Sequence, residues 1–169
     1  MDITVASFII SVLAILVSFG ALLRKPAIPQ NSTTSNTEKA HFHTMQLHAY
    51  ERLVLLCERI ALPNLISRTA SSDLSAREMQ YILIENIKQE FDYNASQQIY
   101  VSPSAWSLVR DLRDQTILII NRIADGLSPN AVAADLNKQL LEVIMSQEDN
   151  PMHIIVLEAL NSEAKKLMR

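Results

Sequence analysis

The amino-acid sequence predicts an all-α protein: an N-terminal transmembrane helix, a flexible linker, and then an antiparallel bundle of about five helices. Three observations lead to this fold class. After position 38, apolar residues recur at intervals of three and four, which is the period of an amphipathic helix. The 169 residues include only two glycines, which leaves few of the tight turns that sheets need. The first part of the chain contains a long run without charge.

That uncharged run, residues 4–23, reads TVASFIISVLAILVSFGALL and holds 20 residues. As a helix it would span about 30 Å, the thickness of the hydrocarbon core of a bilayer. Asp2 precedes the run and the basic pair Arg24 and Lys25 follows it, which is the reverse of the charge order in a signal peptide. We therefore expect an uncleaved helix in contact with the lipid bilayer, with a cleaved export signal as the alternative.

The same basic pair predicts an orientation, because Lys and Arg next to a membrane helix are retained on the cytoplasmic side. The N-terminus is then expected outside and the rest of the chain in the cytoplasm. The single cysteine, Cys57, is compatible with a reducing compartment.

Residues 24–37 are expected to form the juxtamembrane basic pair and a linker. The stretch 26–37, PAIPQNSTTSNT, combines two prolines with polar residues and has no helical apolar stripe. A coil of this length has an end-to-end distance of about 20 Å. The domain that follows, residues 38–169, is therefore expected to be tethered near the bilayer without rigid docking.

The first helix of this domain is expected from about Glu38 to Ala61, with Pro63 as the residue that ends it. Its apolar residues share one face and are predicted to be buried: Phe42, Met45, Ala49, Leu53, Leu56, Cys57 and Ile60.

The second and third helices have clear start signals. Ser75 and Glu78 have the spacing of a capping box, and the second helix is expected to end near Asn94. The Ser-Pro pair at 102–103 predicts an N-cap followed by proline at the first helical position. Gly126 is expected to end the third helix in the left-handed conformation.

A second Ser-Pro pair, at 128–129, predicts the start of the fourth helix, and Asn-Pro at 150–151 predicts the start of the last. The last helix has an apolar stripe made of Ile154, Leu157, Leu160, Ala164 and Leu167. Packing of this stripe on its own bundle is the preferred interpretation, and a homo-oligomer seam is the alternative.

The residues with most potential as metal ligands lie at the start of the domain: Glu38, His41, His43 and His48. Glu38 and His41 have the Glu-x-x-His spacing of di-iron bundles, but those sites need a second such pair. His41 and His48 are two helical turns apart, too far to share one ion without other ligands. We favour a solvated histidine cluster over a metal site.

Other chemistries have less support. No serine or cysteine stands in a nucleophile motif, and the 15 Lys and Arg residues are scattered at a net charge of −3. The sequence thus predicts no catalytic residue, no cofactor and no nucleic-acid partner, and an enzyme is the less favoured class.

The stretch EFDYNASQQIYVSPSAW, residues 90–106, holds four of the nine aromatic residues. We interpret it mainly as the joint between the second and third helices. Tyr93, Gln97 and Gln98 have no structural role in that joint, so they form a candidate interaction patch.

Two stretches, LHAYERLVLLCERI with NLISR (residues 47–60 and 64–68) and the joint itself, resemble the signature segments of an uncharacterised Bacteroidota family. Its members are small single-pass membrane proteins with a cytoplasmic helical domain. The resemblance covers the anchor, the linker and about residues 45–125. It implies a bacterial inner (cytoplasmic) membrane location, and because the family has no assigned activity it carries over no functional residue.

These observations predict a membrane-anchored helical interaction or scaffolding module with a protein partner of unknown identity. The alternative is a membrane-tethered metal-dependent enzyme or sensor that uses the Glu38 and histidine cluster.

Overall fold

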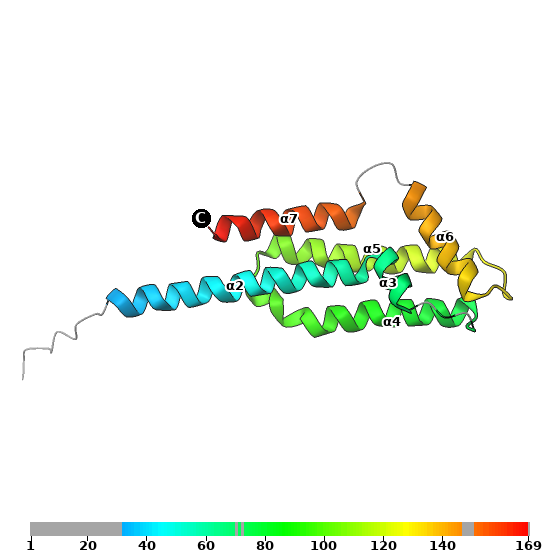
Figure 1. The fold of residues 1–169 in the computed structure, drawn as a ribbon, viewed down its shortest axis with the longest axis horizontal. Helices are drawn as coiled ribbons and strands as arrows, with labels where there is room; N and C mark the ends of the chain where they lie inside the picture. Colours follow the sequence, from blue (N-terminus) through cyan, green and yellow to red (C-terminus); the bar gives the residue numbers. More distant parts are fainter. Residues whose placement is uncertain (1–31, 70, 72, 147–150, 169) are drawn as a thin grey trace, which may run out of the picture. The chain divides into compact units, whose positions relative to one another are not determined.

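The computed structural model describes residues 32–69, 71, 73–146 and 151–168. This part of the chain contains six α-helices, one 3₁₀ helix and no strand (Figure 1). The elements are α2 (Ser32–Ile60), α3 (Leu62–Thr69), α4 (Ala76–Asn94), η1 (Ala95–Ile99), α5 (Pro103–Asp125), α6 (Ala133–Ser146) and α7 (Met152–Leu167). The all-α prediction is confirmed for these residues.

The chain divides into two units, Met1–Thr37 and Glu38–Arg169. The predicted transmembrane helix, residues 4–23, lies outside the described residues. None of the helices that the structure describes is both long enough and apolar enough to cross a membrane. The second unit contains the helical bundle.

Four helices of this unit, α2, α4, α5 and α7, run along a common direction, and α6 lies across the ends of α4 and α5 (Figure 1). Polar contacts show that α2 and α4 are antiparallel, because Arg52 meets Asn94 whereas Arg59, seven residues later, meets Glu90. Helix α5 runs back alongside α4, and α7 runs back alongside α5 (Figure 1).

The core lies between the helices and takes leucine, isoleucine, valine or methionine from each of the six described α-helices. Its largest fully buried side chains are Leu53, Leu56, Ile60, Leu65, Met79, Leu83, Ile87, Val109, Ile120, Leu136, Leu140 and Leu160. Each such side chain contributes about 1.5–3 kcal/mol by leaving water. Cys57 is also buried, as its helical spacing predicts, and burial, with a smaller effect of the Glu58 charge, raises its pKa to about 12.

Two helix starts agree with their predicted caps. The Glu78 N–H donates to Ser75 Oγ at 3.2 Å and the Ser75 N–H donates to Glu78 Oε2 at 2.9 Å, which completes the capping box of α4. Ser102 Oγ accepts from the Ala105 N–H at 3.0 Å at the start of α5.

Helix α3 is not among the helices that the sequence predicts, because Pro63 is expected to end the first helix. Pro63 is instead the second residue of α3, a position in the first turn where its missing N–H is not needed. Backbone hydrogen bonds continue across the boundary between α2 and α3, since the Leu65 N–H donates to the Ala61 oxygen at 2.9 Å. The Asn64 amide also donates to the Glu58 carbonyl at 2.9 Å.

Helix α2 begins at Ser32, inside the range 24–37 that we expected to be a linker. Residues 32–37 contain no glycine or proline, so nothing in them interrupts the helix. The predicted buried face of α2 is also partly wrong. Phe42 is 50% exposed and Met45 is half-buried, because the other described helices end before they reach this part of α2.

The turn after α5 differs from the prediction as well. Gly126 has φ −83°, so it is not left-handed. Helix α6 starts at Ala133 rather than at the Ser-Pro pair, because the backbone before it bonds to the start of α4. The Ala76 N–H donates to the Ala131 oxygen and the Ala133 N–H to the Leu74 oxygen, both at 2.9 Å.

Candidate interaction surface

The four candidate metal ligands do not come together. Glu38, His41, His43 and His48 are all exposed along the first part of α2. His48 Nδ1 lies 3.0 Å from Glu51 Oε2, one turn further along the same helix. No group of three or more His, Cys, Asp or Glu side chains in the described residues is placed to hold a metal ion.

The three residues of the predicted patch have different environments. Tyr93 is 75% exposed at the end of α4, and Gln98 is exposed in η1. Gln97 is half-buried, and its amide donates to Ser96 Oγ at 3.3 Å. The Gln98 amide donates to the Ala95 oxygen at 2.9 Å. Both glutamines are thus engaged locally, and Tyr93 is the member of the patch that offers a large free surface.

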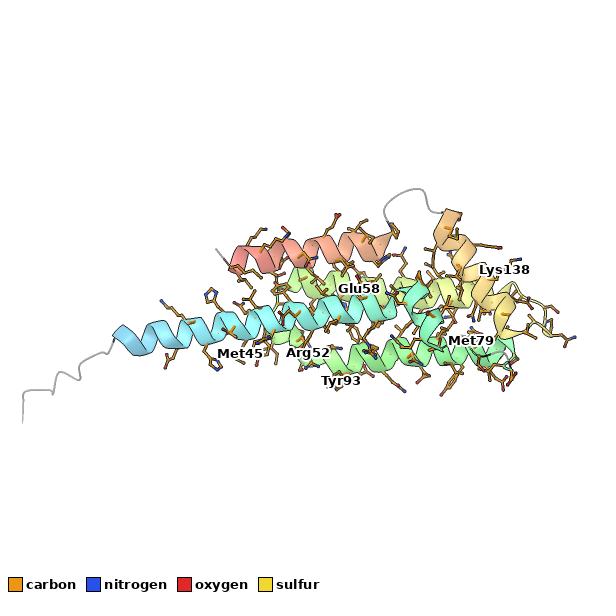
Figure 2. The ribbon with its side chains drawn as sticks, viewed as in Figure 1. Met45, Arg52, Glu58, Met79, Tyr93 and Lys138 are labelled. Atoms are coloured by element: carbon orange, nitrogen blue, oxygen red, sulfur yellow. The ribbon has the colours of Figure 1, made fainter. Side chains whose placement is uncertain are left out.

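Tyr93 does not stand alone, because Arg52 of α2 lies over its ring with the guanidinium carbon 5.0 Å from the centroid (Figure 2). Arg52 Nε also donates to Asn94 Oδ1 at 3.2 Å. Asn94 is itself buried, and its amide nitrogen donates to the Glu90 carbonyl at 2.8 Å. A buried amide thus holds the arginine, and the arginine covers one face of the tyrosine.

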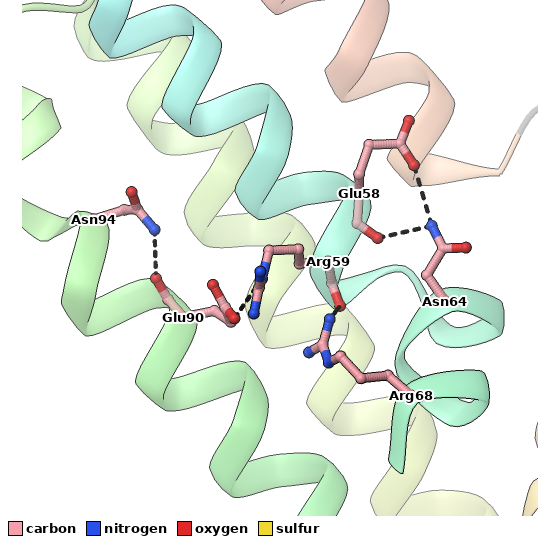
Figure 3. A network of polar contacts seen from close by, with 6 residues as sticks. All are labelled: Glu58, Arg59, Asn64, Arg68, Glu90 and Asn94. Atoms are coloured by element: carbon pink, nitrogen blue, oxygen red, sulfur yellow. Dashed lines mark hydrogen bonds and ion pairs between the residues drawn. The ribbon is translucent and has the colours of Figure 1, made fainter. Parts of the chain in front are cut away.

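A second arginine of α2, Arg59, also joins this helix to α4, two helical turns after Arg52. Arg59 Nε lies 2.5 Å from Glu90 Oε1, and the Glu90 side chain is only 17% exposed. Arg68 of α3 donates to the Arg59 carbonyl at 3.2 Å, so its guanidinium lies close to Arg59 (Figure 3). Three arginines and one glutamate therefore border this side of the α2–α4 contact.

An apolar side chain lies between the two arginines of α2. Leu55 is three residues after Arg52 and four before Arg59, so the three share one face of the helix, and Leu55 is 61% exposed. The adjoining hollow of about 320 Å³ is lined by Arg59, Asn86, Gln89, Glu90 and Tyr93. We call the set Arg52, Leu55, Arg59, Asn86, Gln89, Glu90 and Tyr93 the α2–α4 surface.

The α2–α4 surface contains one exposed tyrosine and two arginines. Tyrosine and arginine are the residue types enriched in the regions of interfaces that dominate binding energy. Sequence reasoning found Tyr93 but missed Arg52, Leu55 and Arg59. The spacing of 52, 55 and 59 places the three on one helical face, but only the structure shows that Leu55 is exposed there.

A separate polar cluster fixes the end of the bundle near the joint. The Tyr50 hydroxyl donates to Glu163 Oε2 at 2.6 Å and accepts from the Ser102 N–H at 3.3 Å. Ser104 Oγ lies 3.4 Å from Glu163 Oε1. This Tyr50–Glu163 clamp connects α2, the start of α5, and α7.

The clamp also changes the ionisation of its members. Burial acts to raise the pKa of Glu163, but hydrogen bonds from Tyr50, Ser102 and Ser104 hold it below its ordinary value. Burial, and then the bond to Glu163, raise the pKa of Tyr50. Both groups therefore keep their usual charge states at neutral pH, and the clamp has the properties of a structural contact.

A cavity beside His153 is the remaining feature of interest. It lies among α3, α5, the end of α6 and the start of α7, and its volume of about 60 Å³ is well below that of ordinary ligand pockets, about 300–1,000 Å³. It offers no site for a substrate.

Comparison with curated proteins gives no match, and neither does comparison with solved structures. Comparison with protein families matches residues 1–167, nearly the whole chain, to a family of unknown function. The match includes the first 31 residues as well as the helical domain. The chain therefore belongs to this uncharacterised family, DUF7935.

Proposed function

We propose that this chain is a single-pass membrane protein whose helical domain is an interaction or scaffolding module, and that the α2–α4 surface binds its protein partner. One observation carries the proposal. Tyr93 and Leu55 expose large apolar surfaces beside arginines that are already held in place. Such a surface loses little side-chain entropy when a partner binds.

Charge favours one kind of partner for this surface. Arg52, Arg59 and Arg68 border it, and Glu90 is the carboxylate that pairs with one of them. A partner segment with acidic side chains next to an apolar one would complement both the arginines and Leu55. Binding of this kind should weaken as the salt concentration rises.

The proposed setting is the inner (cytoplasmic) membrane of a bacterium, with the helical domain in the cytoplasm. The uncharged residues 4–23 and the basic pair after them support this orientation. The resemblance to single-pass proteins of Bacteroidota supports the same setting.

The binding proposal is tested by chemical crosslinking in native membranes, followed by affinity purification of the full chain. Leu55→Ala together with Tyr93→Ala should reduce recovery of the partner. A matched variant, Tyr81→Ala with Leu118→Ala, removes two side chains that are 67% and 49% exposed elsewhere on α4 and α5, and it should keep the partner. Equal recovery from the two variants would refute the assignment of this surface.

The anchoring proposal has its own test. Alkaline-carbonate extraction should leave the protein in the membrane fraction. A C-terminal alkaline phosphatase fusion should be inactive, and a C-terminal fluorescent-protein fusion should fluoresce. An active phosphatase fusion would place the domain outside the cytoplasm and would contradict the proposed orientation.

A further inference from the structure

Arg52 is held on two sides by the residues that end α4. Its Nε donates to Asn94 Oδ1 at 3.2 Å, and its guanidinium carbon lies 5.0 Å from the centroid of the Tyr93 ring (Figure 2). Asn94 is 5% exposed, and its amide nitrogen donates to the Glu90 carbonyl at 2.8 Å (Figure 3). Because both ends of this buried amide are bonded, Asn94 has a fixed orientation, and it fixes the orientation of Arg52.

The terminal nitrogens of Arg52 remain available for another contact. A guanidinium has five N–H donors, one on Nε and four on the two Nη atoms. Within the described residues, the hydrogen bond of Arg52 is made by Nε, and neither Nη atom has a partner. Arg52 is half-buried, so part of its side chain stays accessible. Two Nη atoms of this kind match the geometry of a carboxylate that accepts two parallel hydrogen bonds.

The charge of Arg52 also distinguishes it from its neighbour on this surface. Arg59 pairs with Glu90 Oε1, and the Glu90 side chain is only 17% exposed. Arg52 is held instead by a neutral amide and a neutral ring, and no acidic side chain of the described residues forms an ion pair with it. An incoming carboxylate would therefore compete with Glu90 at Arg59, whereas at Arg52 it would meet an uncompensated positive charge.

We propose that Arg52 is the residue of the α2–α4 surface that binds an aspartate or glutamate side chain of the protein partner, and that Asn94 is its positioning residue. This assignment rests on the proposed function, and it names the arginine that recognises the carboxylate. Because Asn94 and Tyr93 hold the guanidinium before binding, little side-chain entropy is lost when the carboxylate arrives. Leu55, which is 61% exposed one turn further along α2, offers an apolar contact beside it.

Asn94→Asp separates recognition from structural support. The new carboxylate would keep an acceptor for Arg52 Nε, but it would also neutralise Arg52 from within the protein. A purely structural role predicts that aspartate preserves partner recovery from crosslinked membranes, whereas a recognition role predicts a several-fold loss. The matched control is Asn121→Asp, which should keep the partner, because Asn121 Oδ1 accepts from Gln80 Nε2 at 2.8 Å in the contact between α4 and α5.

A measurement without the partner makes the test independent of the proposed function. Acetate supplies a bare carboxylate, and chloride at the same ionic strength controls for screening by salt. In the detergent-solubilised full chain with isotope-labelled arginine, acetate should shift the side-chain NMR signals of Arg52 several-fold more than those of Arg59. Arg52→Lys assigns the Arg52 signals by their disappearance, and Asn94→Asp should remove the selective shift.

The acetate comparison uses the wild-type chain, so it stands even if a variant fails to fold. Equal acetate shifts at Arg52 and Arg59, or equal shifts with acetate and chloride, would overturn the inference. Undiminished partner recovery from Asn94→Asp would overturn it as well. If Leu55→Ala with Tyr93→Ala keeps the partner while acetate still selects Arg52, the proposed function fails at this surface and the carboxylate-binding role of Arg52 is supported.

Discussion

The hydroxyl of Tyr50 joins α2 to the start of α5 and to α7. It donates to Glu163 at 2.6 Å and accepts from the Ser102 N–H at 3.3 Å. Tyr50→Phe leaves both partners without this contact and should lower the free energy of unfolding by about 1–2 kcal/mol. Urea denaturation measures this loss. Tyr81→Phe, at a tyrosine that is 67% exposed, is the control and should change little.

Glu163 makes the stability dependent on pH. Its pKa in the folded protein lies below its ordinary value of 4.5, so near that pH the unfolded chain binds more protons than the folded one. The contribution of the carboxylate is complete above pH 4.5 and is lost as the pH falls through the folded pKa. Glu163→Gln should therefore be less stable than the wild type at pH 7, and the difference should narrow under acid conditions. If urea titrations give the same difference in free energy of unfolding between wild type and Glu163→Gln at pH 7 and at pH 3, the charged Glu163 carboxylate does not have this role.

Two neighbouring leucines of α2 provide a direct check of how this helix packs. Leu53 is fully buried and Leu55 is 61% exposed. Leu53→Ala should cost about 2–5 kcal/mol of stability because it leaves a cavity. Leu55→Ala should change stability by less than about 0.5 kcal/mol. Similar losses in both variants would show that the face of α2 has been assigned wrongly.

The end of α5 offers a test in which the structure and the sequence pattern disagree. A left-handed Gly126 would make alanine unfavourable, but its φ of −83° suits any residue. A Cβ placed there would meet the Ile123 oxygen at 3.5 Å, an ordinary contact. Gly126→Ala should therefore stabilise the domain by roughly 0.4–1 kcal/mol, because alanine gives the unfolded chain fewer backbone conformations to lose on folding. A lower melting temperature in thermal unfolding would contradict the observed conformation.

The helices that could be predicted are those whose signals are local. The capping box of Ser75 and Glu78 and the Ser102 cap define their own helix starts, and the spacing of apolar residues identifies most of the core. The errors came from longer-range contacts. Helix α6 starts late because residues 131 and 133 bond to residues 76 and 74, which are distant in sequence. Pro63 starts a helix because its neighbours Leu62 and Leu65 find buried positions.

The candidate surface could be predicted only in part, for the same reason. The aromatic content of the joint drew attention to Tyr93, but the arginine over its ring comes from position 52 in another helix. No local pattern reports a contact across 41 residues of sequence. Gln97 and Gln98 belong to the predicted patch because the sequence assigns them no structural role, whereas in the structure their side chains bond within the local turn.

Considered as a whole, the described part of the chain is a helical domain with the α2–α4 surface at the side of its bundle. The proposed function joins this surface to the uncharged residues 4–23.

Photo-crosslinking in living cells provides the decisive test of the interaction module. Benzoylphenylalanine replaces Tyr93 in one variant and Tyr81 in the other, two exposed tyrosines on different faces of α4. We predict a discrete crosslinked product with a protein partner from position 93 that is lost when Arg52 is changed to Glu, and little product from position 81. Equal products from both positions, or a product from position 81 alone, would contradict the proposal that the α2–α4 surface binds the partner.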